Sequence, residues 1–379
     1  MIKGLIRKLA ALFMLLLLSV TLSGCWDDMP LDTRTLVLAM GFYPAKKPGQ
    51  ITVDFSFPTP TGLTSSNGAG SGGGGGKGPS FDTLSGTGYT LAQAFSAAQA
   101  KTNRDLYLGH TILLVFSTHL KAHQFNLLMN ALDRIGTLDK TPFVAAVSAP
   151  FSKVVGVKMT QEEFPALYFE ELFTCALCTQ FSLGVRLWDA SNRLATPGVD
   201  LVLPEITPGA KGKGPEVDHI ALYRGYHYVA TLGHSETTAY SMAAGKSRKS
   251  SLYFPHHWHA EFNAVSNNMH LHVDPKGSTV EVTVSLHFTE TLESLDTDTE
   301  SAHQLAVLSR VSSAAIGRQV LTFLEKTQKD DSDVLGVGRQ LSWIDPTAFR
   351  KYRPWHRVYP HVHFIVKTAV KINKMGDLK

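Results

Sequence analysis

The last third of the chain carries the pattern that most restricts its fold. Apolar and polar residues alternate strictly from Val280 to Phe288, which predicts a strand with one buried face. A helical pattern follows over about 300–329, and a second alternating stretch covers 358–372. A sheet with one long helix across it buries all three apolar faces together. We therefore expect residues 251–379 to form an α+β domain of antiparallel strands plus one long helix.

The preceding residues mix strand and helix patterns, which predicts an N-terminal α/β domain over 25–203. Within it the Gly- and Ser-rich segment 58–80 cannot bury apolar surface, so we expect a flexible loop. A Pro-, Gly- and Lys-rich stretch begins at residue 204, and residues 204–250 are expected to form a linker and a small middle domain. The whole chain is thus expected to be multi-domain and mixed α/β, each domain a β-sheet with packed helices. Strand patterns lie at 35–42, 51–57, 111–116, 143–147, 220–223 and 226–232, and helix patterns at 90–101, 119–135 and within 151–194.

The first residues have the form of an export signal. Basic residues and no acidic ones precede an apolar run over 9–22, which is shorter than the roughly 20 residues needed to span a bilayer. The run ends in Leu-Ser-Gly-Cys, the form of a lipobox. We expect residues 1–24 to be removed as a lipoprotein signal peptide and Cys25 to carry a lipid with acyl chains such as palmitate. Several acyl chains make such attachment effectively permanent.

The charge of the chain argues against nucleic acid as a partner. The formal net charge is +4, and three basic residues fall in the leader, so the mature chain carries 4 − 3 = +1. A nucleic-acid binder needs a concentrated basic surface. The basic residues lie instead in small groups, such as Arg350, Lys351 and Arg353. Such groups are usually solvated, although contact with anionic lipid headgroups is the alternative for a tethered protein.

Two further cysteines, Cys175 and Cys178, lie in an apolar segment that reads as a helix over 168–181. No second Cys-x-x-Cys and no leading strand accompany them, so a zinc or redox site lacks its context. Buried structural thiols are the favoured interpretation, with a local disulfide as the next.

The sequence shows no catalytic constellation. It contains no Gly-x-Ser-x-Gly elbow, no His-Glu-x-x-His and no dinucleotide fingerprint, and the Gly-rich segment fails the Walker A pattern. The chain has 16 histidines, but the pairs at 270/272 and 361/363 alternate with apolar residues and should point to solvent. We expect no enzyme activity, no metal and no cofactor.

Short stretches along the mature chain resemble one known family. A Trp-Asp pair follows the expected lipid site, a Gly-His pair precedes a buried strand, and a Gly-rich turn with two later tryptophans follows the long helix. The residues that carry the resemblance are Trp26, Asp27, Gly109, His110, Asp333, Gly336, Gly338, Trp343 and Trp355. In this order they resemble the Ger(x)C family, the lipoprotein C subunits of spore germinant receptors.

The resemblance implies a function that composition and spacing do not reach. It implies a protein of α/β domains on the outer surface of the spore inner membrane, acting with an A subunit and a permease-like B subunit in nutrient sensing. The alternative from the residues alone is an extracytoplasmic solute-binding lipoprotein that captures a nutrient directly. Such proteins need two doubly wound lobes, and the pattern over 251–379 does not supply the second.

Overall fold

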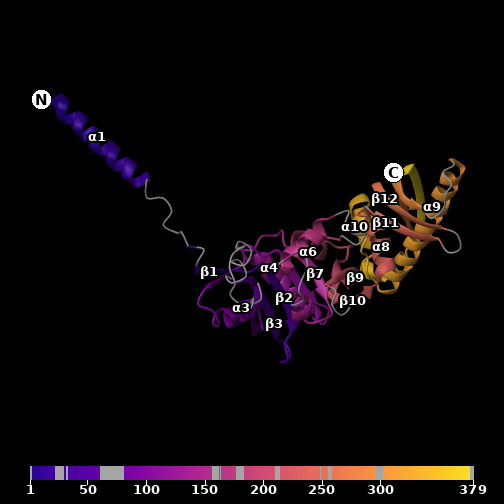
Figure 1. The fold of residues 1–379 in the computed structure, drawn as a ribbon, viewed down its shortest axis with the longest axis horizontal. Helices are drawn as coiled ribbons and strands as arrows, with labels where there is room; N and C mark the ends of the chain where they lie inside the picture. The colour runs from indigo at the N-terminus through magenta and orange to yellow at the C-terminus, as the bar shows by residue number, and fades with distance from the viewer. Residues whose placement is uncertain are drawn as a thin grey trace, which may run out of the picture.

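A computed structural model describes most of the chain (Figure 1). The described residues are 2–21, 30, 33–59, 81–155, 162, 164–175, 183–209, 214–247, 249–254, 258–295 and 302–375. The expected lipid site Cys25 with Trp26 and Asp27, the segment 60–80 of the expected flexible loop, and Cys178 lie outside them. Helix α1 (Ile2–Thr21) contains most of the expected export signal. Of the helices within the described ranges, none is long and apolar enough to cross a bilayer.

An eight-stranded sheet occupies the N-terminal half, with its strands in the order β10-β9-β8-β7-β6-β2-β3-β4. Strands β2, β6, β7 and β8 pair in parallel, and the remaining pairs are antiparallel. A separate parallel pair joins β1 to β5, so the expected strand over 35–42 divides between two sheets. The bounds are β1 Arg34–Leu36, β2 Ala39–Pro44, β3 Ile51–Pro58, β4 Phe81–Gly88, β5 Asp105–Tyr107, β6 Leu113–Ser117, β7 Phe143–Val147, β8 Val202–Thr207, β9 Glu216–Arg224 and β10 His227–Leu232.

Helices cover both faces of this sheet, which explains why its central strands are apolar without alternation. In β6, Leu114 and Phe116 enter a core beneath α3, α4 and α7, whereas Leu113 and Val115 enter a second core beneath α5 and α6. Thr90 caps α3 by accepting from the backbone N–H of Gln93. The bounds are α3 Leu91–Gln99, α4 Ala122–Arg134, α5 Phe151–Val155, α6 Pro165–Thr174 and α7 Leu187–Ala195.

The segment expected as a linker and middle domain contributes to the first sheet. Strand β8 runs to Thr207, and β9 and β10, which contain the strand patterns expected at 220–223 and 226–232, form a hairpin around Gly225 and extend the same sheet. The hairpin joins the sheet because it has apolar residues to bury on both faces, among them Ile220 and Ala221. A hairpin on its own could not cover both faces. Helix α8 (His234–Ala243) then leads to the C-terminal sheet. The domain bounds themselves stay a prediction.

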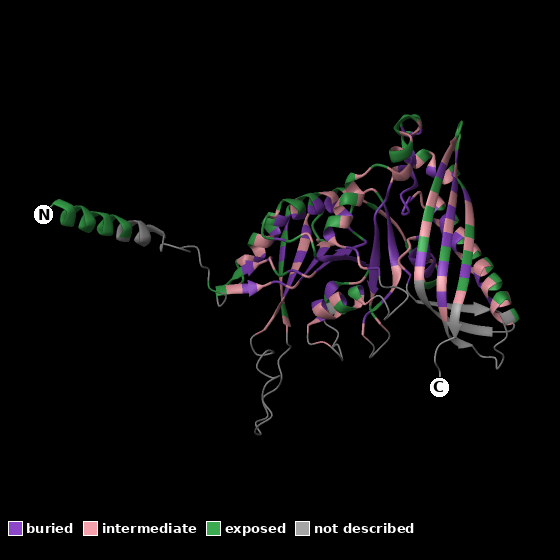
Figure 2. Cartoon of the chain, turned by 90° about the horizontal axis from the view of Figure 1, so that it is seen from above, coloured by how far each residue is buried: buried purple, intermediate pink, exposed green. Residues whose placement is uncertain are grey.

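The C-terminal half is an α+β unit, as expected. Its sheet has the order β11-β12-β13-β14, with antiparallel pairing up to β13 and a parallel β13–β14 pair made by the return through the long helix α9. Alternate residues of β13 from Val280 to Phe288 are buried against Leu308, Ile316 and Val320 of α9. Figure 2 shows this alternation as banding along the strands. The bounds are β11 Lys249–Phe254, β12 Trp258–Lys276, β13 Thr279–Leu295, α9 Ala302–Lys329 and β14 His363–Met375.

Two local expectations are wrong. The final strand begins at His363, because the preceding residues form two 3₁₀ turns, η2 (Trp355–Arg357) and η3 (Tyr359–His361), which bury Trp355 and Tyr359. The helix expected over 168–181 ends at Thr174, where Cys175 has a non-helical backbone and caps α6. Short helices α10 (Val337–Ile344) and α11 (Pro346–Lys351) connect α9 to the turns.

Candidate functional site

The Gly-rich turn after α9 surrounds one fully buried carboxylate, that of Asp333. Its Oδ1 accepts from the backbone N–H groups of Gly336 at 2.8 Å and Val337 at 2.9 Å. Its Oδ2 accepts from the N–H of Gly338 and from Nε1 of Trp355, both at 2.9 Å. The backbone donors belong to the first turn of α10, where the free N–H groups of a helix favour an anion. The side chain of Asp333 thus fills an anion site that the chain provides for itself.

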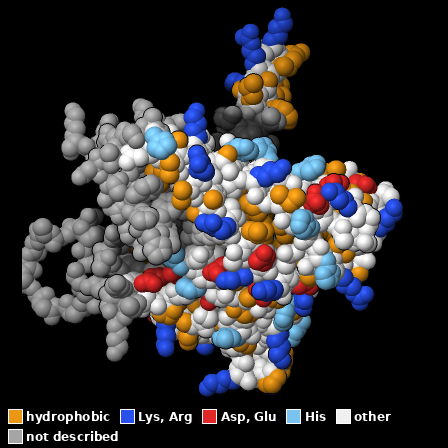
Figure 3. Space-filling model, turned by 90° about the vertical axis from the view of Figure 1, so that its right-hand side faces the viewer, with side chains coloured by type: hydrophobic (Ala, Val, Ile, Leu, Met, Phe, Trp, Pro, Cys, Tyr) orange, Lys and Arg blue, Asp and Glu red, His pale blue; other side chains and the backbone are white. Residues whose placement is uncertain are grey.

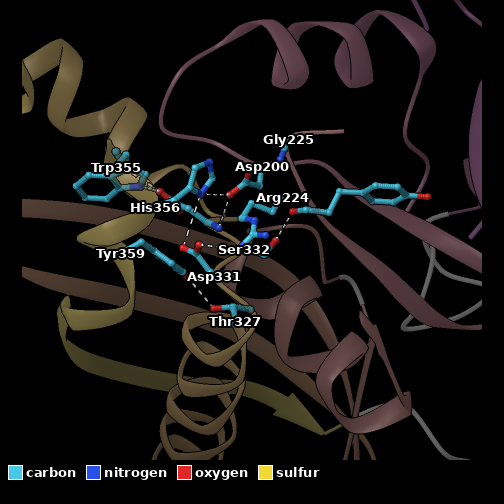
Figure 4. Close-up of polar contacts among 12 residues, drawn as sticks. Asp200, Arg224, Gly225, Thr327, Asp331, Ser332, Trp355, His356 and Tyr359 are labelled. Atoms are coloured by element: carbon cyan, nitrogen blue, oxygen red, sulfur yellow. Dashed lines mark hydrogen bonds and ion pairs between the residues drawn. The ribbon is translucent and has the colours of Figure 1, made fainter. Parts of the chain in front are cut away.

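A second buried carboxylate, Asp200, connects this turn to the N-terminal sheet (Figure 4). Asp200 lies just before β8, and its Oδ2 accepts from the N–H of Asp333 at 2.8 Å. Its Oδ1 accepts from the N–H of Gly225 in the β9–β10 turn at 2.8 Å. The backbone N–H of Asp200 in turn donates to the carbonyl of Asp333. We call Asp200, Asp333 and Trp355 the carboxylate clamp, because they join three segments from the two halves of the protein.

Two glycines let the backbones approach beside the clamp. A Cβ on Gly338 would lie 2.6 Å from Cε2 of Trp355 and 2.8 Å from the Cα of Gly198. Gly198 has φ +80°, and a Cβ there would lie 2.4 Å from the carbonyl carbon of Gly338. The N–H of Arg339 donates to the carbonyl of Gly198 at 2.7 Å across this contact. Glycine is therefore required at both positions by space, and at Gly198 also by backbone conformation.

Charged side chains surround the clamp on its more accessible side. Arg224 pairs with Asp331 at 3.2 Å, and Nδ1 of His356 lies 3.6 Å from Asp331 and 3.9 Å from Asp200. Asp331 has φ +51°, an uncommon backbone conformation for a residue other than glycine. Ser332 Oγ donates to the carbonyl of Tyr223 at 2.6 Å and adds another bond between the halves.

Burial dominates the electrostatics of the clamp. It raises the pKa of Asp333 to about 6, although the backbone N–H groups of Gly338 and Val337 act to lower it. Burial also raises the pKa of Asp200, against the donors from Gly225 and Asp333. The charge of Asp200 also acts to raise the pKa of Asp333, and the charge of Asp331 acts to raise the pKa of Asp200, as like charges do. Because both carboxylates are buried and accept from these donors, the arrangement fastens backbone segments and offers neither carboxylate to a substrate.

A cavity of about 380 Å³ lies next to the clamp. Its walls come from both halves of the protein, and it contains the guanidinium of Arg353 above the ring of Phe349, 5.5 Å from the centroid. Seven residues line it: Pro197, Gly198, Phe349, Arg353, Pro354, Trp355 and His356.

The structure brings together four of the residues singled out in the sequence, Asp333, Gly336, Gly338 and Trp355. It places Gly109 and His110 elsewhere, after β5, where a Cβ on Gly109 would meet the ring of Tyr107 at 2.6 Å. Trp343 lies at the end of α10 and is 67% exposed.

Sequence reasoning missed Asp200 and Gly198, which are as central to the clamp as Asp333. A single Asp or Gly before a strand carries no signal of its own, and Asp200 lies 133 residues from its partner. The Pro-Gly pair at 197–198 indicates a turn, but not what the turn contacts.

The cysteine and histidine expectations have different outcomes. Cys175 is disulfide-bonded, so the expectation of a free thiol is wrong at this position. Its expected partner in a local disulfide, Cys178, lies outside the described residues. Several histidines of the C-terminal strands, among them His270 and His272, are exposed as expected. Figure 3 shows histidine, acidic and basic side chains mixed over the C-terminal end. Among the residues described, no group of three or more His, Cys, Asp or Glu side chains is arranged to hold a metal ion.

Comparisons with known proteins identify the family. Residues 27–208 match the spore germination protein N-terminal domain, and residues 218–376 match the spore germination B3/GerAC-like C-terminal domain. A solved structure titled "Crystal Structure of the GerBC protein" matches with a TM-score of 0.55 at 15% identity, over 89% of this chain and 99% of that one. No curated protein matches the chain. The fold is thus that of GerBC, and the family models cover most of the chain, which belongs to the Ger(x)C, or GerAC-like, family of spore germination proteins, as its residues predicted.

Proposed function

We propose that this protein is a non-enzymatic subunit of a spore germinant receptor, anchored through a lipid on Cys25 to the outer surface of the spore inner membrane. It acts there with membrane-embedded A and B subunits, and the small-molecule germinant is bound by those other subunits. The observation that carries the proposal is the family match over both halves of the chain, directly after a complete lipobox sequence.

The carboxylate clamp supports a holding role. The carboxylate of Asp200 accepts from the backbone of Gly225 in the N-terminal half and of Asp333 in the C-terminal half, so the two sheets are fastened to each other. A protein that positions membrane partners needs its own surfaces held in a fixed relation. Tethering adds to this, because it raises the effective concentration of those surfaces near the partners and lets modest contacts suffice.

The test is a deletion strain complemented with the wild-type chain or with Cys25→Ala. Spores of the deletion strain should stay viable but fail to respond to one germinant, and their A and B subunits should be reduced in the inner membrane. Cys25→Ala should lose lipid labelling and weaken the response. Normal germination of the deletion strain with every nutrient tested, or lipid labelling that persists in Cys25→Ala, contradicts the proposal.

The cavity beside the clamp is the observation that favours the second candidate, direct capture of a nutrient. Its arginine and aromatic walls would suit a small carboxylate. Calorimetric titration of the full chain with the germinant of its receptor separates the two functions. Micromolar binding that Arg353→Gln abolishes would establish the second candidate. A titration without heat of binding would support the first, in which the other subunits bind the germinant.

A further inference from the structure

Helices α10 and α11 meet at a corner with an unusual surface. Trp343 and Ile344, at the end of α10, are 67% and 55% exposed. Beyond α1, they are the only two large apolar side chains adjacent in sequence that are exposed among the described residues. Arg350, Lys351 and Arg353 follow, and all three are exposed. We call these five residues the α10–α11 corner.

The local fold fixes which side chains of this corner face outward. Phe349 and Tyr352 are buried, and the hydroxyl of Tyr352 donates to the carbonyl of Gly277 at the β12–β13 turn. Asp345 caps α11 by accepting from the N–H groups of Thr347 and Ala348. The inward residues therefore hold α11 against the sheet and leave the basic side chains in solvent.

The basic residues of the corner keep their charges free. Within the described ranges, Arg350, Lys351 and Arg353 form no ion pair. The nearest acidic residue along the chain, Asp345, uses Oδ1 for the helix cap. A fourth basic group, the guanidinium of Arg339, lies 5.2 Å from the ring centroid of Trp343. The corner thus combines exposed apolar side chains with unneutralised positive charge.

We propose that the α10–α11 corner rests on an anionic lipid surface. Tryptophan beside arginine and lysine is the combination that favours a membrane interface, because the indole enters the headgroup region while the cations meet lipid phosphates. The inference rests on the proposed lipid anchor, which brings the corner close to a bilayer. It goes beyond the anchor by giving the protein a second contact and hence an orientation.

The position of the corner determines that orientation. Strand β1, the first element after the expected anchor, and helix α10 lie in different halves of the elongated body (Figure 1). Contacts at the anchor and at this corner would hold the body against the bilayer at two separate points. A protein held by the anchor alone would be free to tilt away from it.

The test uses the full lipidated chain in vesicles that contain bromine-labelled lipids, which quench tryptophans at the bilayer. Vesicles of phosphatidylcholine alone are compared with vesicles that also contain phosphatidylglycerol, at low and high salt. Quenching should increase in the anionic vesicles at low salt, and Trp343→Phe should abolish the increase. Trp188→Phe, which removes a tryptophan that is 53% exposed on α7, should leave it unchanged.

A charge variant with a matched control completes the test. Arg350→Gln/Lys351→Gln should lower the ratio of docked to undocked protein about fivefold per charge, about thirtyfold in all. Lys46→Gln/Lys47→Gln removes the same charge from an exposed turn and should have no such effect. Protein that floats with the vesicles but shows no Trp343-dependent quenching overturns the inference. The inference is also overturned if the Arg350/Lys351 variant loses binding to the A or B subunit while its quenching is unchanged, because the corner would then contact a protein. Protein that fails to float refutes the anchor, and with it this inference.

Discussion

Replacing Trp355 by phenylalanine removes one of the four N–H donors to the buried carboxylate of Asp333. The indole N–H donates at 2.9 Å, and the ring is almost fully buried between Phe349 and Tyr359. A hydrogen bond to a charged group contributes about 1.5–3 kcal/mol. The smaller ring adds a loss on the order of 1 kcal/mol through reduced burial. We expect Trp355→Phe to lower the free energy of unfolding by about 3 kcal/mol.

The measurement is urea unfolding followed by circular dichroism, with Trp188→Phe as the matched control. Trp188 is 53% exposed, so the control should lie within about 0.5 kcal/mol of the wild type. The pH dependence separates the hydrogen bond from the ring volume. Because the bond is stronger to the ionised carboxylate and the pKa of Asp333 is about 6, the cost should be greater at pH 8 than at pH 4.5. Equal costs for the two variants, or a cost that does not change with pH, would refute this account of the clamp.

Three further changes test the same region. Gly338→Ala should destabilise the protein by about 1–3 kcal/mol, because the new Cβ would lie 2.6 Å from an indole carbon of Trp355. Gly136→Ala, where a Cβ has no neighbour within 4 Å, is the control and should leave the urea unfolding midpoint unchanged. Burial raises the pKa of Asp333 from 3.8 to about 6, so its contribution to stability is complete below pH 3.8 and is lost as the pH rises through 6. The stability advantage of the wild type over Asp333→Asn should thus be greater at pH 4.5 than at pH 7.5, by about 2 kcal/mol, in unfolding curves at the two pH values. Tyr359→Phe, which removes a buried hydroxyl 2.7 Å from Thr327 Oγ1, should cost about 1 kcal/mol by thermal unfolding at constant pH.

Periodic patterns predicted the elements whose burial follows one simple rule. The strict alternation from Val280 to Phe288 became β13 with those apolar residues buried, and the helical pattern near 300–329 became α9. The apolar run at 143–147 became β7, with every residue buried. An element with one buried face has a periodic apolar pattern, and a strand buried on both faces is a continuous apolar run. Both patterns can be recognised from the sequence without tertiary information.

Features that depend on distant partners could not be predicted in this way. Strands β13 and β14 pair in parallel because α9 crosses the sheet between them. The residues of the two strands do not indicate whether the pair is parallel or antiparallel. The 3₁₀ turns before β14 place Trp355 in the clamp, where its indole N–H donates to Asp333. The apolar residues before His363 therefore bury individual aromatic rings, although their pattern would also suit a strand. The contact between Asp333 and Asp200 likewise rests on three-dimensional proximity rather than on local pattern.

Helix α10 connects the two features for which we propose roles. Its first turn supplies the N–H groups that bind the carboxylate of Asp333, and its last residues are Trp343 and Ile344 of the α10–α11 corner. The helix has eight residues, a length of about 12 Å at 1.5 Å per residue. Because the clamp fastens the start of α10 to Asp200 before β8, a displacement of the corner by a membrane would be transmitted through one short helix to the N-terminal sheet. Trp355→Phe should therefore loosen the orientation of the N-terminal half on vesicles while leaving Trp343-dependent quenching intact, since it weakens the joint and not the corner. Loss of that quenching in Trp355→Phe would mean that the corner itself depends on the clamp for its fold.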